Sequence, residues 1–197
     1  VEGGKVDWAA HGNDIGALLF DQLAFDDAVR VAIDFAKKDG NTLVVITSDH
    51  GNANPGLIYG KECNKNFDNL AHFLHTNDFT LQSINLTDSV SQVRDLLTHN
   101  FGNIPFSQEE AKEILSFYTE GKQEDGLYNY KKLPYRILAE IQKKHTSVGW
   151  ISMDHSSDYT ELAMYGPGSQ NLPPFIENYK MHNFLLEAAE VDMLEKY

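Results

Sequence analysis

Apolar side chains recur every three to four residues between Asn13 and Lys38, and this spacing predicts one long helix. Asn13 or Asp14 can cap its start, and Gly40 stands where a glycine commonly follows a helix. The stripe consists of Leu18, Leu19, Leu23, Phe25, Ala28, Val29, Ile33 and Phe35.

The run Thr42–Thr47 follows this helix directly and is apolar and β-branched. Such a run predicts a strand buried on both faces, as in a parallel sheet. A helix, a tight turn and a buried strand in succession indicate an α/β fold.

Further helices are expected from capping and breaking signals. One is predicted over Asp88–His99 with Thr87 as its cap. Another is predicted over Ser107–Glu120, where Ser107 and Glu110 form a capping box before Gly121. The last two are predicted over Pro134–Lys144 and from about Pro174 to Glu195.

Three more strands are expected beyond Gly51, where the pattern is weaker. They are Phe79–Ile84, Val148–Met153 and Glu161–Tyr165. There are no internal repeats and no linker composition, so residues 1–197 are expected to form a single domain. Residues 64–132 are expected to be a helical and irregular insertion within it.

Composition and charge narrow the classes of function. The chain is 42% hydrophobic and 23% charged, as in ordinary soluble proteins, with no apolar stretch long enough to span a membrane and no signal-peptide pattern. Sixteen basic and 29 acidic residues give a net charge of −13, which argues against nucleic acid as a partner. The same charge argues against a small phosphate as the substrate, unless bound metal ions reverse the local electric field.

The first candidate chemistry lies at Asp7 and His11, four residues apart. On a helical turn this spacing places both side chains on one face. A carboxylate oxygen and an imidazole nitrogen are both good zinc ligands. The pair alone is weak evidence, and a surface aspartate with a nearby histidine is the alternative.

Asp49 and His50 follow the predicted strand Thr42–Thr47. Ligand sites in α/β sheets lie beyond the carboxyl ends of the strands, so an Asp-His-Gly sequence there favours a metal site. His155 comes just after another predicted strand and could complete the site. A polar loop and a turn histidine are the alternatives for these two places.

Together these segments resemble the alkaline phosphatase family. The resemblance is carried by Val-Glu-Gly-Gly-x-x-Asp-Trp-x-x-His at residues 1–11, by the helix-to-strand stretch Phe35–Val44, and by Thr-x-Asp-His-Gly at residues 47–51. It continues through Gly149-Trp150, His155 and Ala163–Gly168. The middle of the chain carries little of it.

The resemblance implies a centre of two zinc ions and one magnesium ion. Asp7, His11 and His155 match the ligands of the first zinc. Asp49 and His50 match two ligands of the second zinc, and Glu2 matches a magnesium ligand. The family hydrolyses phosphate monoesters through a serine that becomes transiently phosphorylated. In such two-metal catalysis the metal ions neutralise the charge on the phosphate.

The family's serine motif, its metal-bridging aspartate and its phosphate-binding arginine have no match here. We therefore expect the chain to be the C-terminal part of an alkaline-phosphatase-like three-layer sandwich. On its own it should be catalytically inactive and bind zinc weakly or not at all. The resemblance further implies a homodimeric parent in the periplasm or outside the cell.

Two alternatives stay open at the level of sequence. One is a non-catalytic metal-binding or interaction module that reuses the fold. The other is a related hydrolase of sulfate esters or phosphodiesters, in which similar residues bind the metals but the nucleophile differs.

Overall fold

The computed structural model describes residues 1–191, which form helices and three short two-stranded ladders. The chain divides into two compact units. The first consists of Val1–Ala24 with His50–Asp158, and the second of Phe25–Asp49 with the chain from Tyr159 onward. The mixture of helices and strands confirms the predicted α/β class.

The long N-terminal helix was predicted correctly. After the short helix α1 (Gly4–His11), α2 spans Ile15–Asp39. Asp14 is the cap, since its Oδ1 accepts a hydrogen bond from the backbone N–H of Ala17 at 2.9 Å. Gly40 ends the helix at φ +72°, a left-handed conformation that favours glycine.

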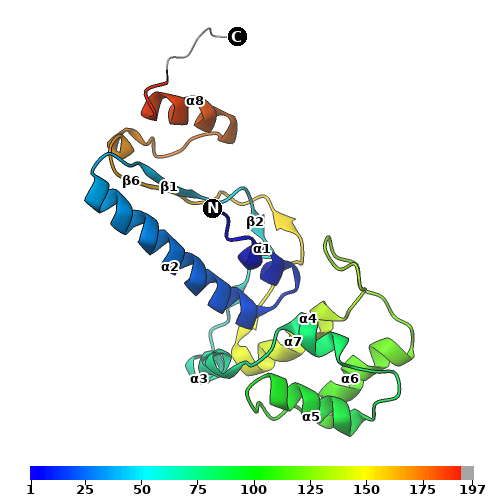
Figure 1. Ribbon diagram of the computed structural model, residues 1–197. Coiled ribbons are helices and arrows are strands. Elements are labelled where there is room, and N and C mark those ends of the chain that lie inside the picture. The colour runs from blue at the N-terminus through cyan, green and yellow to red at the C-terminus, as the bar shows by residue number, and fades with distance from the viewer. Residues whose placement is uncertain (192–197) are drawn as a thin grey trace. The chain divides into compact units, whose positions relative to one another are not determined.

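The second unit contains an antiparallel ladder of β1 (Val44–Thr47) and β6 (Leu162–Tyr165), with Val44 opposite Tyr165. In Figure 1 the later part of α2 runs alongside this ladder. The expectation of a parallel strand buried on both faces is wrong for the described residues. An apolar run indicates hydrophobicity but does not indicate the direction of the partner strand. The burial is also lower than expected, since three residues of β1 are half-buried and Thr47 is exposed.

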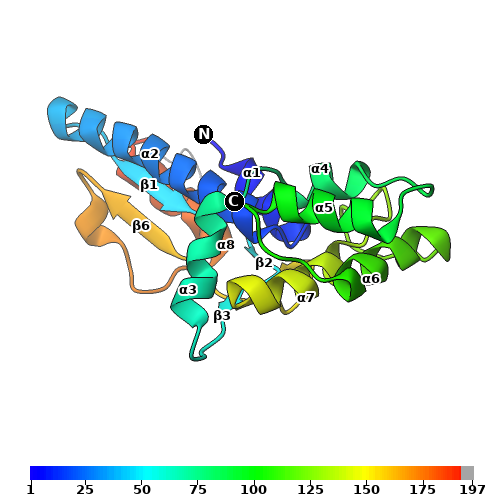
Figure 2. The same cartoon turned by 90° about the horizontal axis from the view of Figure 1, so that it is seen from below.

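The main hydrophobic core lies in the first unit, among helices that Figure 2 shows grouped together. They are α4 (Asn77–Gln82), α5 (Val90–Asn100), α6 (Gln108–Thr119) and α7 (Tyr135–Thr146). The same unit also contains α3 (Cys63–Asp68) and the 3-10 turn η1 (Asn69–His72). The almost completely buried side chains of this core include Leu81, Val93, Leu97, Phe101, Ile114 and Leu138.

Two of the predictions in this region need correction. Residues 79–84 do not form a strand, because Thr76 caps a helix by accepting the backbone N–H of Phe79 at 3.1 Å. The helix α5 was predicted, but Ser89 caps it rather than Thr87. Gln92 completes a capping box with Ser89, and this reciprocal pair satisfies two backbone donors at once.

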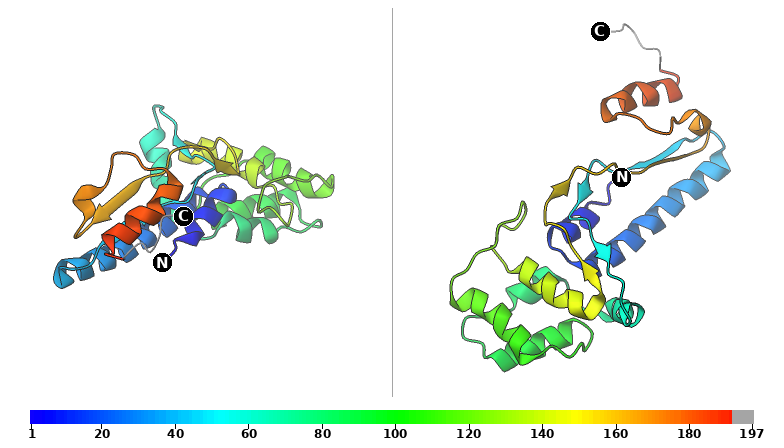
Figure 3. Two further views of the ribbon diagram at one scale, coloured as in Figure 1. Left: turned by 90° about the horizontal axis from the view of Figure 1, so that it is seen from above. Right: turned by 180° about the vertical axis from the view of Figure 1, so that it is seen from behind.

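The remaining strands are very short. β3 (Gly56–Leu57) pairs with β4 (Val148–Gly149), and β2 (Gly51–Asn52) pairs with β5 (His155–Ser156), as Figure 3 shows from behind. The strand predicted over Val148–Met153 therefore ends after two residues. The backbone turns because the N–H groups of Ile151 and Ser152 both donate to the carbonyl of Ala53.

The second unit also holds the 3-10 turn η2 (Ser169–Asn171) and the helix α8 (Asn178–Ala188). α8 is shorter than the predicted Pro174–Glu195, and part of that prediction lies outside the described residues. No helix within residues 1–191 combines the length and apolar character that a membrane span requires.

Replacing Ser107 by alanine tests the capping box of α6. Ser107 Oγ accepts the N–H of Glu110, and Glu110 Oε2 accepts the N–H of Ser107. We expect Ser107→Ala to lower the free energy of unfolding by about 1 kcal/mol in urea denaturation. Ser116→Ala, within the same helix, is the matched control and should change it by less than about 0.5 kcal/mol. Equal effects of the two variants would contradict the assignment of the cap.

Burial raises the pKa of Asp14 from 3.8 to about 6, although hydrogen bonds from the N–H groups of Ala17 and Asn77 oppose the shift. The folded chain thus holds this proton more tightly than the unfolded chain. The stabilisation is present below pH 3.8 and is lost as the pH rises through about 6. When the pH is lowered from 7 to 4, the free energy of unfolding of the wild-type chain should increase by about 2 kcal/mol relative to that of Asp14→Asn. Urea denaturation with a chelator present measures this difference, and a constant difference across that range would disprove it.

Candidate metal centre

The helix α1 presents Asp7 and His11 on the same face, as their spacing predicts. His11 Nε2 lies 3.6 Å from Asp7 Oδ1. Both groups point to one spot because residues four apart in a helix stand one turn above each other.

The nitrogen of His11 that is available as a metal ligand is Nε2. The His11 ring is buried, with 5% of the residue exposed, and Nδ1 lies 2.7 Å from the carbonyl oxygen of Met153. A carbonyl can only accept, so Nδ1 carries the proton and Nε2 keeps its lone pair. Nε2 is buried without a hydrogen-bond partner, which is costly unless a cation or donor meets it.

The ladder of β2 and β5 brings two further histidines together. His155 lies within β5, not after a strand as predicted, and it stands opposite Asn52 of β2. His50 directly precedes β2, and its ring stacks on that of His155 with 3.6 Å between centroids. The His155 ring is also 5.2 Å from that of His11.

One ligand atom from each of Asp7, His50 and His155 lies within 4.8 Å of the others. Three regions distant in sequence thus converge on one place. Two imidazoles and a carboxylate suit zinc. His11 is not a member of this cluster, but its Nε2 lies 3.6 Å from Asp7 Oδ1 and is a further donor beside it. This donor set fits a divalent metal ion.

Asn52 is a member of the site that the sequence did not reveal. Its Nδ2 donates to Asp7 Oδ1 at 2.7 Å and to the carbonyl of Asp7 at 3.3 Å. These bonds orient the carboxylate and tie β2 to α1. Nothing in the Asn- and Gly-rich stretch after His50 distinguishes this asparagine from a turn residue.

Gly51 is required by the close pairing of β2 with β5. A Cβ at this position would overlap Ser156 Oγ, the side chain directly opposite. The glycine of the Asp-His-Gly sequence therefore allows the strand that carries His155 to approach.

Glu2 and Asp49, the other two predicted ligands, are exposed and do not belong to the three-residue cluster. Glu2 precedes α1, and its carboxylate turns back toward Gly4. Asp49 is the last residue of the Phe25–Asp49 segment of the second unit and directly precedes His50 in the chain. The division of the ligands between two zinc ions and a magnesium ion stays a prediction.

Comparison with known proteins connects this site to a family. The family model described as alkaline phosphatase matches residues 1–191. Alkaline phosphatase 4 of Bacillus subtilis strain 168 is 29% identical over 189 residues, which cover 95% of this chain and 38% of that protein. The chain therefore spans about two-fifths of the length of such relatives.

Solved structures share the fold. The crystal structure of Thermus thermophilus alkaline phosphatase matches with a TM-score of 0.83 at 23% identity, covering all of this chain and 43% of that one. The cold-active alkaline phosphatase of a psychrophilic Shewanella species matches with a TM-score of 0.70 at 17% identity, covering 97% and 44% of the two chains. The predicted fold, an α/β part of such a protein, is confirmed. From the match over residues 1–191, we conclude that this chain belongs to the alkaline phosphatase family.

Proposed function

We propose that this chain supplies much of the metal centre of an enzyme that hydrolyses phosphate monoesters. The observation that carries the proposal is the convergence of Asp7, His50 and His155 within 4.8 Å. Family membership supports the reaction class over a non-catalytic module or a sulfate-ester hydrolase.

Within this proposal Asp7, His11 and His155 hold the first zinc. Asp49 and His50 are ligands of the second zinc, and Glu2 is a ligand of magnesium. The buried Nε2 of His11 supports its role, because Met153 already fixes the proton on Nδ1. When bound, the ions would neutralise the charge of the phosphate and polarise the ester bond.

The protein residues around the metals act by positioning. Asn52 holds the carboxylate of Asp7, and the carbonyl of Met153 holds the imidazole of His11. Such partners keep a ligand in the tautomer and orientation that it needs. The acidic net charge of −13 would otherwise repel a phosphate, so metal binding is also needed for the substrate to approach.

We also propose that the 197-residue chain alone does not turn over substrate. No Asp-Ser-Ala sequence occurs in it, because Asp88-Ser89 is followed by valine and Ser89 is the cap of α5. Ser48 lies beside Asp49, but the resemblance gives it no nucleophilic role. By family resemblance, we further propose a homodimeric parent in the periplasm or outside the cell. From the pattern along the chain, we propose that residues 64–132 are an insertion within the fold.

A zinc titration tests the ligand assignment. We expect weak binding to the wild-type chain by isothermal titration calorimetry at neutral pH. His11→Ala and His155→Ala should each weaken it at least tenfold, about 1.4 kcal/mol. His99→Ala is the control, since His99 is an exposed histidine of α5. If His99→Ala weakened binding as much as His155→Ala, the assignment would fail.

A phosphatase assay tests the proposed lack of turnover. With zinc and magnesium supplied, the 197-residue chain should hydrolyse p-nitrophenyl phosphate no faster than buffer does. The physical reason is that a metal centre without its nucleophile lacks the group that attacks phosphorus. Turnover that His155→Ala abolishes would disprove this claim, whereas turnover that survives His155→Ala would indicate a contaminant.

A further inference from the structure

A cavity of about 760 Å³ lies in the first unit, next to the candidate metal centre. It is lined by one side of α1, the first turns of α2, the start of α4 and the loop before α7. His11 forms part of its wall, so the cavity reaches one residue of the candidate metal centre. The volume is in the range of small-molecule binding sites.

Aromatic rings form one wall of this cavity. The Tyr128 ring meets the His11 ring edge-to-face with 4.4 Å between centroids, and it contacts Tyr130 in the same manner at 6.0 Å. Trp8 of α1 also lines the cavity and is 69% exposed, while Tyr130 is 78% exposed. Large rings left open beside a site offer π-faces, which attract cations.

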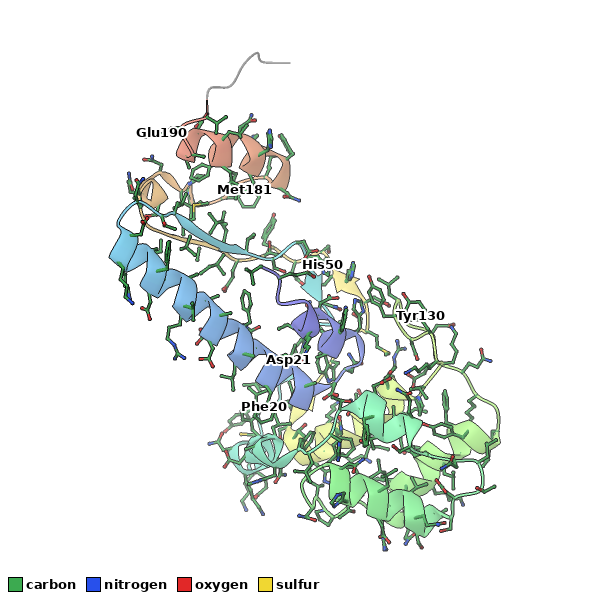
Figure 4. All side chains as sticks on the ribbon, in the orientation of Figure 1. Phe20, Asp21, His50, Tyr130, Met181 and Glu190 are labelled. Carbon is green, nitrogen blue, oxygen red and sulfur yellow. The ribbon has the colours of Figure 1, made fainter. Side chains whose placement is uncertain are left out.

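The cavity is also lined by carboxylates. Asp14, Asp21 and Asp78 all line the cavity, and Figure 4 places Asp21 on α2 and Tyr130 on the loop before α7. Asp14 is buried and accepts two backbone N–H groups, whereas Asp21 and Asp78 are partly exposed.

The cations near the cavity do not balance these carboxylates. Asp78 accepts the hydroxyl of Tyr135 at 2.5 Å and lies 3.6 Å from Lys131 Nζ. Lys5 is the lysine among the lining residues. With Lys131 paired to Asp78, Asp14 and Asp21 face the single charge of Lys5, so the cavity keeps an excess of negative charge.

We propose that this cavity binds the alcohol part of the substrate and that this alcohol carries an ammonium group. The inference rests on the proposed function, because the phosphate end is assigned to the metal centre beside His11. The ammonium would lie among the aromatic rings and near Asp21, where both the π-faces and the carboxylates favour a cation. An anionic alcohol would be repelled, and a neutral one would gain only the ring contacts.

An NMR titration of the full 197-residue chain tests this without metal, phosphate or catalysis. The probe is 4-(aminomethyl)benzyl alcohol, and 1,4-benzenedimethanol is its uncharged counterpart of the same shape. The chain has two tryptophans, of which Trp8 lines the cavity and Trp150 does not. We expect the ammonium probe to shift the indole N–H of Trp8 but not that of Trp150, and to bind about tenfold more tightly than the diol.

Charge variants give the matched comparison. Asp21→Asn should weaken binding of the ammonium probe at least fivefold and leave that of the diol unchanged. Asp26→Asn removes the same charge from an exposed position of α2 that does not line the cavity, and it should have no effect. The amide spectrum reports whether each variant is folded.

Several outcomes would overturn the inference: equal binding of the two probes, no shift of Trp8, or equal losses in Asp21→Asn and Asp26→Asn. These outcomes are independent of the zinc titration. Zinc binding through His155 without ammonium binding would refute only the inference about the cavity. Ammonium binding without any zinc dependence on His11 or His155 would refute the proposed metal centre instead.

Discussion

The hydrogen bond between His11 Nδ1 and the carbonyl of Met153 joins two parts of the chain that are 142 residues apart. It fixes the tautomer of His11 and leaves the buried Nε2 without a hydrogen-bond partner. It also ties α1 to the segment that leads into β5, where His155 lies. The candidate centre therefore depends on a contact that both orients one donor and places another.

A second set of buried polar contacts holds the turn between α1 and α2 in place. Asn13 adopts φ +44°, which asparagine tolerates better than most residues, and its Nδ2 donates to the carbonyl of Ser152 at 2.8 Å. Asn77 Nδ2 donates to the carbonyl of Asn13, and Gln142 Nε2 donates to Asn77 Oδ1. The turn between α1 and α2 is thereby linked to α4 and α7, and buried groups satisfied in this way specify one arrangement of the backbone.

The charge distribution is consistent with a substrate that is anionic at one end and cationic at the other. Metal ions at Asp7, His11 and His155 would reverse the negative field where the phosphate binds. The cavity beside His11 keeps its carboxylates and open aromatic rings, so its field stays negative. A chain of net charge −13 can in this way provide two neighbouring sites of opposite preference.

The sequence by itself determined the features that depend on neighbouring residues. The helix α2 with its Gly40 terminus, and α6 with its Ser107–Glu110 capping box, follow from local hydrogen bonds and helical spacing. The sequence left Asn13 and Asp14 as alternative caps of α2, and the structure decided for Asp14. The shared face of Asp7 and His11 follows from the same spacing. The family resemblance was also available from residues 1–11 and 47–51, and the match over residues 1–191 confirms it.

Only the tertiary structure decided how distant segments meet. The helix at Asn77–Gln82, the antiparallel partner of β1 and the place of His155 within β5 all depend on contacts that a local pattern does not report. Asn52 and the carbonyl of Met153 escaped prediction because their roles come from partners 45 and 142 residues away. Local sequence sets the propensity of each element, whereas pairing, burial and the convergence of ligands are set by which surfaces the folded chain brings together.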